Sequence, residues 1–169
     1  FKIGRMDLDT TRGKHGYQKI IGAFEAREID VLVGTQMLSK GLDFENVSLV
    51  GILNADTMLN FPDFRAHERA YDMMVQVSGR AGRSKKQGNV AIQSFNPYHQ
   101  ILQQVSTTNY TEMYKEQLQE RWQYKYPPYY RLIKITLKHR DFNKVENGVN
   151  WLAKALQNSF GEHVLGPTA

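Results

Sequence analysis

The chain has 169 residues, of which 41% are hydrophobic and 23% charged, a composition typical of a globular protein with one or two domains. It contains no cysteine, which excludes a disulfide framework and a cysteine-based zinc site within the chain. The net charge of +5 permits nucleic-acid binding without requiring it. No apolar run reaches the roughly 18 residues of a membrane span, and no signal peptide is recognisable.

The first 97 residues alternate between short apolar runs and amphipathic segments. The apolar runs predict strands at 3–8, 31–33, 47–53 and 89–95. Apolar residues at helical spacing predict helices at 17–28 and 64–77. This order of elements predicts an α/β domain with a mostly parallel sheet.

The second part of the chain has a different pattern, and Asn96-Pro97 is the expected boundary. Residues 101–105 and 110–124 predict helices, residues 131–139 a half-buried strand, residues 145–160 an amphipathic helix, and residues 163–165 the start of a second strand. We therefore divide the chain into an α/β domain at 1–97, a helical connector at 98–128, and the beginning of an α+β domain at 129–169. We expect this last domain to be truncated.

The most informative motif is Gln76-Val77-Ser78-Gly79-Arg80-Ala81-Gly82-Arg83, in which two arginines lie three residues apart and each follows a glycine. Arginine stays charged and binds phosphate oxygens through two hydrogen bonds. The motif therefore predicts that Arg80 and Arg83 stabilise a phosphate in a nucleotide-driven reaction, with Gln76 beside them. The alternative is a surface turn of glycine and arginine.

A second segment of interest, Gly34–Phe44, follows the predicted strand at 31–33. Ligands of open α/β sheets bind at the carboxyl ends of the strands, where we expect this segment to lie. The candidates for contacts with nucleic-acid phosphates are Thr35, Gln36 and Lys40. Gly41 allows close approach of a ligand to the backbone, and Asp43 is a candidate acceptor for a ribose hydroxyl. The alternative is an ordinary loop with Asp43 as a cap or turn residue.

Two further clusters are weaker. Aromatic residues alternate with cations over 121–131, which fits either a stacking platform for single-stranded nucleic acid or core packing in the second domain. His67-Glu68 begins like a zinc-protease motif, but Tyr71 stands where the second histidine belongs. We therefore predict no metal site in this chain.

Taken together, the motifs resemble the second RecA-like lobe of superfamily-two helicases, with residues 31–44 similar to motif V and residues 76–83 similar to motif VI. Within that superfamily, the chain most resembles the primosomal replication-restart helicases. The stretches that carry this resemblance are Arg5-Met6-Asp7-Leu8-Asp9-Thr10-Thr11, Gly34-Thr35-Gln36-Met37-Leu38-Ser39-Lys40-Gly41, Asp63-Phe64-Arg65-Ala66-His67-Glu68-Arg69, and Gln76–Arg83 followed by Lys86-Gln87-Gly88. The Tyr126-Pro127-Pro128-Tyr129 turn and Leu165-Gly166-Pro167 resemble the start of that family's C-terminal domain.

The resemblance implies a cytoplasmic, DNA-dependent ATPase that unwinds forked DNA 3′→5′ and restarts replication by primosome assembly. It implies that Arg80 and Arg83 sense the γ-phosphate of ATP, and that Gln76 links the nucleotide to DNA. It places the side chains of Thr35, Gln36 and Lys40 on single-stranded DNA, and Gly41 and Asp43 at the nucleotide edge of the cleft. The implied partners are forked and single-stranded DNA, primosome proteins and single-stranded DNA-binding protein.

The chain departs from the family pattern in what it lacks. Gly13-Lys14-His15 is not a Walker A loop, and neither a DEAH-like box nor the family's zinc-binding cysteines occur. We expect the ligands of ATP, Mg²⁺ and Zn²⁺ to lie in sequence outside this chain, which we interpret as a fragment that binds ATP negligibly alone. Two alternatives stay open: a non-enzymatic scaffold that binds DNA or protein, and a related fork-remodelling translocase.

Overall fold

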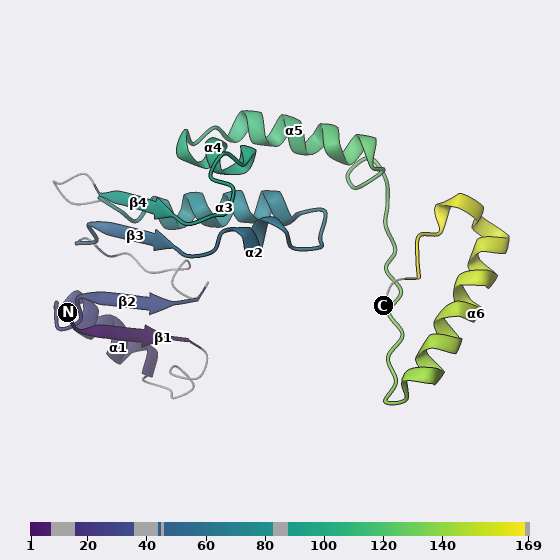
Figure 1. Cartoon of the computed structure of the whole chain (residues 1–169), viewed down its shortest axis with the longest axis horizontal. Helices are drawn as coiled ribbons and strands as arrows, with labels where there is room; N and C mark the ends of the chain where they lie inside the picture. The colour runs from purple at the N-terminus through teal and green to yellow at the C-terminus, as the bar shows by residue number, and fades with distance from the viewer. Residues whose placement is uncertain (8–15, 36–43, 45, 83–87, 168–169) are drawn as a thin grey trace. The chain divides into compact units, whose positions relative to one another are not determined.

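The computed structural model describes residues 1–7, 16–35, 44, 46–82 and 88–167. The chain divides into two compact units, Phe1–Tyr129 and Tyr130–Ala169 (Figure 1). The elements of the first unit are β1 (Ile3–Met6), α1 (Gly16–Glu25), β2 (Val31–Gly34), β3 (Leu49–Ile52), α2 (Asp56–Leu59), α3 (Ala66–Ser78), β4 (Asn89–Ile92), α4 (Gln100–Ser106) and α5 (Tyr110–Gln123). The elements of the second unit are α6 (Phe142–Phe160) and the short 3₁₀ helix η2 (Gly161–His163).

The described strands of the first unit form two parallel pairs. β1 pairs with β2, from Ile3 opposite Val31 to Met6 opposite Gly34. β3 pairs with β4 in the same way. Parallel neighbours require a crossover connection, and α1 and α3 lie in the two crossovers. The predicted α/β class with parallel strands is confirmed.

The larger hydrophobic core of the first unit forms where α3 packs against its neighbouring helices. α3 contributes Ala70, Tyr71 and Met74, whose spacing places them on one helix face. The other buried members are Ala55, Leu59, Ile101, Leu102, Val105 and Met113. Ile52 of β3 and Ile92 of β4 pack against this core, so α3 is fixed to the strand pair that precedes and follows it.

A smaller core supports the β1–β2 pair. Met6 and Phe44 are buried in it, and partly buried residues of α1 surround them. The rings of Phe24 and Phe44 meet edge to face with centroids 4.8 Å apart, a favourable arrangement for two aromatic rings. Phe44 therefore anchors the chain segment that leads from the β1–β2 pair into β3.

The second unit differs from its prediction. Residues 131–139, predicted to form a strand, have no regular secondary structure, and the same holds for Val164 and Leu165. A strand requires hydrogen bonds to a neighbouring strand, and the described part of this unit contains none. Ile133 is one of the apolar residues in the alternating pattern, and it is 89% exposed. The pattern therefore does not mark a buried face. The helix predicted at 145–160 is confirmed as α6, which starts three residues earlier.

Candidate nucleotide and nucleic-acid site

The predicted phosphate-binding motif lies where α3 ends. The helix stops at Ser78, and residues 79–82 continue as a turn, here named the arginine turn. Gln76 is exposed on the last helical turn, and Arg80 is half-buried. The backbone N–H groups of Gly79, Arg80 and Ala81 donate to carbonyl oxygens of the last turn of α3, at 2.9, 3.1 and 3.1 Å.

These three hydrogen bonds change the electrostatics of the helix end. The carboxyl end of a helix carries a partial negative charge on its unsatisfied carbonyl groups, which repels an anion. The arginine turn supplies backbone donors to those carbonyls, and one of its residues, Arg80, carries a permanent positive charge. The backbone hydrogen bonds therefore reduce the repulsion of an anion that this helix end would otherwise exert.

The arginine turn is attached to the segment that precedes β3. The N–H of Gly82 donates to the carbonyl oxygen of Val47 at 3.1 Å. Gly82 has a φ of 79°, a conformation that residues with a side chain rarely adopt. Val47 also packs against the small core around Phe44. Val47 thus connects the arginine turn with the small core around Phe44, a link that the sequence alone did not reveal.

The structure locates only some of the predicted site residues. Thr35 is exposed and directly follows the carboxyl end of β2, as predicted. The arginine turn instead lies at the amino end of the β3–β4 pair, where Val47 precedes β3. These two groups therefore belong to different strand pairs and opposite strand ends. The predicted residues that lie outside the described part of the chain are Gln36, Lys40, Gly41, Asp43 and Arg83.

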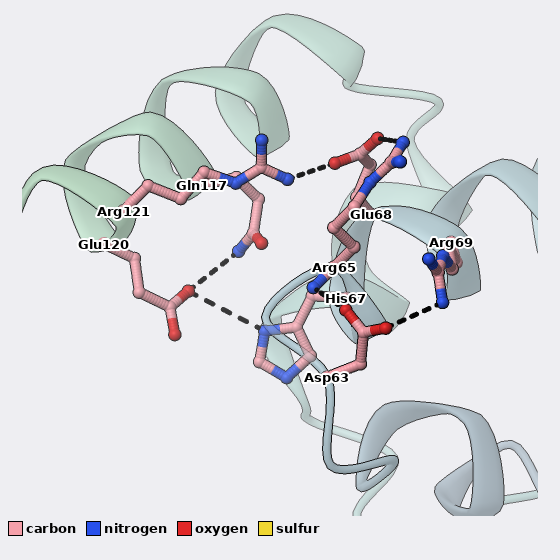
Figure 2. A network of polar contacts seen from close by, with 8 residues as sticks. All are labelled: Asp63, Arg65, His67, Glu68, Arg69, Gln117, Glu120 and Arg121. Atoms are coloured by element: carbon pink, nitrogen blue, oxygen red, sulfur yellow. Dashed lines mark hydrogen bonds and ion pairs between the residues drawn. The ribbon is translucent and has the colours of Figure 1, made fainter. Parts of the chain in front are cut away.

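A polar network at the other end of α3 fastens this helix to α5 (Figure 2). Asp63 accepts from the backbone N–H of Arg65 at 2.8 Å and from the Arg69 side chain at 2.9 Å. Glu68 accepts from Arg65 at 2.7 Å and also pairs with Arg121 of α5. The stretch 63–69, which the sequence comparison with replication-restart helicases singled out, therefore orients the helix that ends in the arginine turn.

Asp63 and Glu68, two carboxylates of the network, are held in the ionised form by lowered pKa values. The hydrogen bond from the Arg65 side chain, followed by the contact with Arg121, lowers the pKa of Glu68 against the opposing effect of burial. The backbone N–H of Arg65 is the main cause that lowers the pKa of Asp63. Charged carboxylates with arginine partners are suited to a structural role and not to proton transfer near neutral pH.

The aromatic cluster at 121–131 is partly explained by the same region. The ring of Phe64 lies 5.3 Å from the Arg121 guanidinium and stacks on Tyr126 with centroids 5.1 Å apart. Tyr126 is thus occupied in packing, whereas Trp122 and Tyr124 are 66% and 59% exposed. Tyr129 and Tyr130 are exposed as well, and the stacking platform for single-stranded nucleic acid stays a prediction for these exposed rings.

A polar cavity of about 490 Å³ lies between the start of α3, the loop before α4, and α5. His67 contacts Glu120 at 3.9 Å, and its ring meets that of His99 edge to face. Burial, with a smaller effect of His67, lowers the pKa of His99, whose Nδ1 accepts from the N–H of Ile101 and caps α4. Among the residues that the structure describes, no group of three or more His, Cys, Asp or Glu is placed to hold a metal ion.

Comparison with known proteins supports a helicase-related role. Residues 1–85 match the family model described as helicase conserved C-terminal domain. The chain is 42% identical to replication restart protein PriA of Bacillus subtilis over 99% of its own length and 21% of that protein. The corresponding proteins of Synechocystis and Treponema pallidum are each 40% identical over 96% and 100% of the chain, and over 20% and 26% of their own lengths. The chain thus spans about a fifth to a quarter of these relatives, and the resemblance seen in its motifs is confirmed.

Proposed function

Because this chain belongs to the family of helicase conserved C-terminal domains, we propose that it is the second RecA-like lobe of an ATP-dependent, superfamily-two DNA helicase that restarts replication. The observation that carries the proposal is the similarity to replication restart proteins over 96–100% of the chain, which includes the arginine turn. The lobe would close against another lobe of the same protein, unwind forked DNA 3′→5′ in the cytoplasm, and support primosome assembly.

The described residues fit one half of an ATP site. Arg80 carries a permanent charge on a hydrogen-bonded turn, and the neighbouring carbonyl groups that would repel phosphate are already hydrogen-bonded. When ATP is bound, its chemistry is phosphoryl transfer to water. The role of Arg80, with Arg83, is to hold charge that develops on the transferred phosphate, while Gln76 on the last turn of α3 relays nucleotide state toward DNA.

The zinc implied for the whole protein does not fit this chain. The sequence has no cysteine for a zinc site. The described residues offer no group of three or more His, Cys, Asp or Glu for Mg²⁺ or Zn²⁺. We propose that the zinc ligands lie outside this chain, as do the Mg²⁺ ligands and the Walker A and DEAH-type motifs that the family resemblance implies.

Of the proposed DNA contacts, the described one, Thr35, lies at the carboxyl end of a strand. Thr35, exposed after β2, is well placed for a phosphate contact, and Gln36 and Lys40 follow it in sequence. Forked and single-stranded DNA, primosome proteins and single-stranded DNA-binding protein are the proposed partners. No helix in the described ranges is long and apolar enough to cross a membrane.

The proposal is tested by Arg80→Ala in the full-length protein. We expect the DNA-stimulated ATPase to lose about 10³-fold or more in kcat, because a charge that stabilises the phosphoryl transition state is removed. The affinity for a forked oligonucleotide, measured by fluorescence anisotropy, should be nearly unchanged. Arg140→Ala, at an exposed position of the second unit, is the matched control and should keep wild-type kcat.

Two other outcomes would redirect the assignment. Loss of DNA affinity with normal ATP turnover in Arg80→Ala would favour the scaffold alternative, in which arginines only hold phosphates. A strand-displacement assay on forks of defined polarity separates the proposed 3′→5′ helicase from a fork-remodelling translocase, which would turn over ATP without releasing a single strand.

A further inference from the structure

Gly88, the residue before β4, contacts the arginine turn so closely that it leaves no room for a side chain. A Cβ atom on Gly88 would lie 2.4 Å from the backbone nitrogen of Gly82 and 2.6 Å from the carbonyl carbon of Ala81. Contacts of Cβ atoms under 3.0 Å essentially never occur. Because both atoms belong to the backbone, a side chain at Gly88 would displace the turn itself.

The same part of the turn is held by a second contact. Gly82 donates its N–H to the carbonyl oxygen of Val47, and Val47 is anchored in the small core with Met6 and Phe44. The positive φ of Gly82 completes the bend between these two contacts. The arginine turn is therefore held by Gly88, by the Val47 carbonyl and by the end of α3, and Arg80 lies one and two residues before the two residues, Ala81 and Gly82, that make the first two contacts.

We infer that Gly88 and the Val47 carbonyl are positioning groups that fix the direction of Arg80 toward the transferred phosphate. The inference rests on the proposed function, since it assigns Arg80 to the phosphate. Groups that stabilise a transition state must be held close to their productive geometry, and a misplacement of about 1 Å costs on the order of 10² in rate. Displacing the turn should therefore slow turnover while Arg80 keeps its charge.

The chain supplies a matched control for Gly88. Gly51 lies in β3, in the same strand pair, and a Cβ atom on it would meet no atom within 4 Å. Gly88→Ala and Gly51→Ala thus make the same chemical change, one against the backbone of the arginine turn and one into open space. Any general effect of replacing a glycine in or next to this strand pair by alanine appears in both variants.

The experiment compares these variants in the full-length protein, with and without single-stranded DNA. Gly88→Ala should lower the kcat of the DNA-stimulated ATPase by about 10–100-fold, with a smaller change in the KM for ATP. Gly51→Ala should match the wild type, and DNA affinity by fluorescence anisotropy should be the same for all three proteins. The double variant Arg80→Ala/Gly88→Ala should be no slower than Arg80→Ala alone, because Gly88 acts through Arg80.

Equal kcat values for Gly88→Ala and Gly51→Ala would overturn the inference, as would a double variant whose losses multiply. If Gly88→Ala fails to fold, the inference is tested instead by comparing the kcat of Gly82→Asn with that of Gly82→Ala. Asparagine adopts a positive φ more readily, so it should retain more kcat than alanine, and equal activity of the two contradicts the inference. Absence of DNA-stimulated ATPase in the wild type would instead refute the proposed function, which separates the two failures.

Discussion

The two units of this chain are stabilised by different interactions. In the first unit, α3 buries Ala70, Tyr71 and Met74 in a core shared with α2, α4 and α5. In the second unit, none of the described residues of α6 is buried, and Trp151 on that helix is 71% exposed. Most helical stability in proteins comes from tertiary packing of an apolar face. The first unit is therefore a cooperative fold, whereas α6 depends on its own capping and helix propensity.

The largest loss of stability is expected from a substitution in the core of the first unit. Met74 is fully buried, and Met74→Ala should lower the free energy of unfolding by about 2–5 kcal/mol, since a cavity replaces the thioether side chain. Leu152→Ala on the half-buried face of α6 makes a similar deletion outside any described core and should cost less than 1 kcal/mol by the roughly proportional loss of buried area. Urea unfolding followed by tryptophan fluorescence and far-UV circular dichroism measures both.

Similar losses in the two variants would break the comparison. They would indicate that α6 buries its apolar face as deeply as α3 does. A smaller slope of the unfolding curve for Met74→Ala, rather than a shifted midpoint, would indicate that the first unit does not unfold in one step.

A smaller effect is expected from the ion pair between α3 and α5. Glu68 and Arg121 have side chains that are 24% and 15% exposed, so the pair is only weakly screened by water. Glu68→Gln should lower the free energy of unfolding by about 1–3 kcal/mol, because it leaves a mostly buried guanidinium without its carboxylate. Glu146→Gln, at an exposed position of α6, is the control and should change stability by less than about 0.5 kcal/mol.

The same pair predicts a pH dependence. The pKa of Glu68 is lowered from its ordinary value of 4.5, so its stabilising effect is complete above that value and is lost as the pH falls through the lowered pKa. Wild-type stability should therefore fall in acid more steeply than that of Glu68→Gln. Identical acid profiles for the two proteins, measured by thermal unfolding at successive pH values, would show that the Glu68 carboxylate, with its partners Arg65 and Arg121, contributes nothing.

Sequence patterns predicted most of the first unit because there local and tertiary preferences agree. The apolar stripe of 64–77 matches the observed face of Ala70 and Met74, and the apolar run 31–33 matches β2. α2 was missed because its four residues are too few to show a helical period. The strand predicted at 131–139 is wrong because alternating apolar residues are not sufficient for a strand. A strand also needs hydrogen bonds to a neighbouring strand.

The sequence predicts which residue types form the candidate site, but it does not predict the contacts that hold the arginine turn in place. Arg80 is a candidate from sequence alone, because two arginines that each follow a glycine form a recognisable local motif. Gly82 contacts Gly88 and donates a hydrogen bond to Val47. The spacing of these residues in the sequence does not predict that they lie close together. α3 ends at Ser78, and this end depends on which carbonyl groups accept hydrogen bonds from the turn. The amino-acid composition does not reveal those hydrogen bonds.

The smallest expected effect compares helix caps in the two units. Asn109 caps α5 by accepting from the N–H of Glu112 at 3.2 Å, and Asp141 caps α6 by accepting from the N–H of Asn143 at 3.0 Å. Alanine at either position should cost about 1 kcal/mol of helix stability. α5 is also held by buried Met113, so Asn109→Ala should lower the Tm of the whole first unit while amide exchange in α5 stays slow.

Asp141→Ala should behave differently because α6 has no buried residue to keep it folded once its cap is lost. Its amides should exchange faster at temperatures far below the main unfolding transition, whose Tm should not move. Hydrogen exchange read by mass spectrometry on peptides from α5 and α6 distinguishes fraying from global unfolding. If Asp141→Ala lowers the main Tm as much as Asn109→Ala does, the two units unfold together, and α6 owes its stability to packing after all.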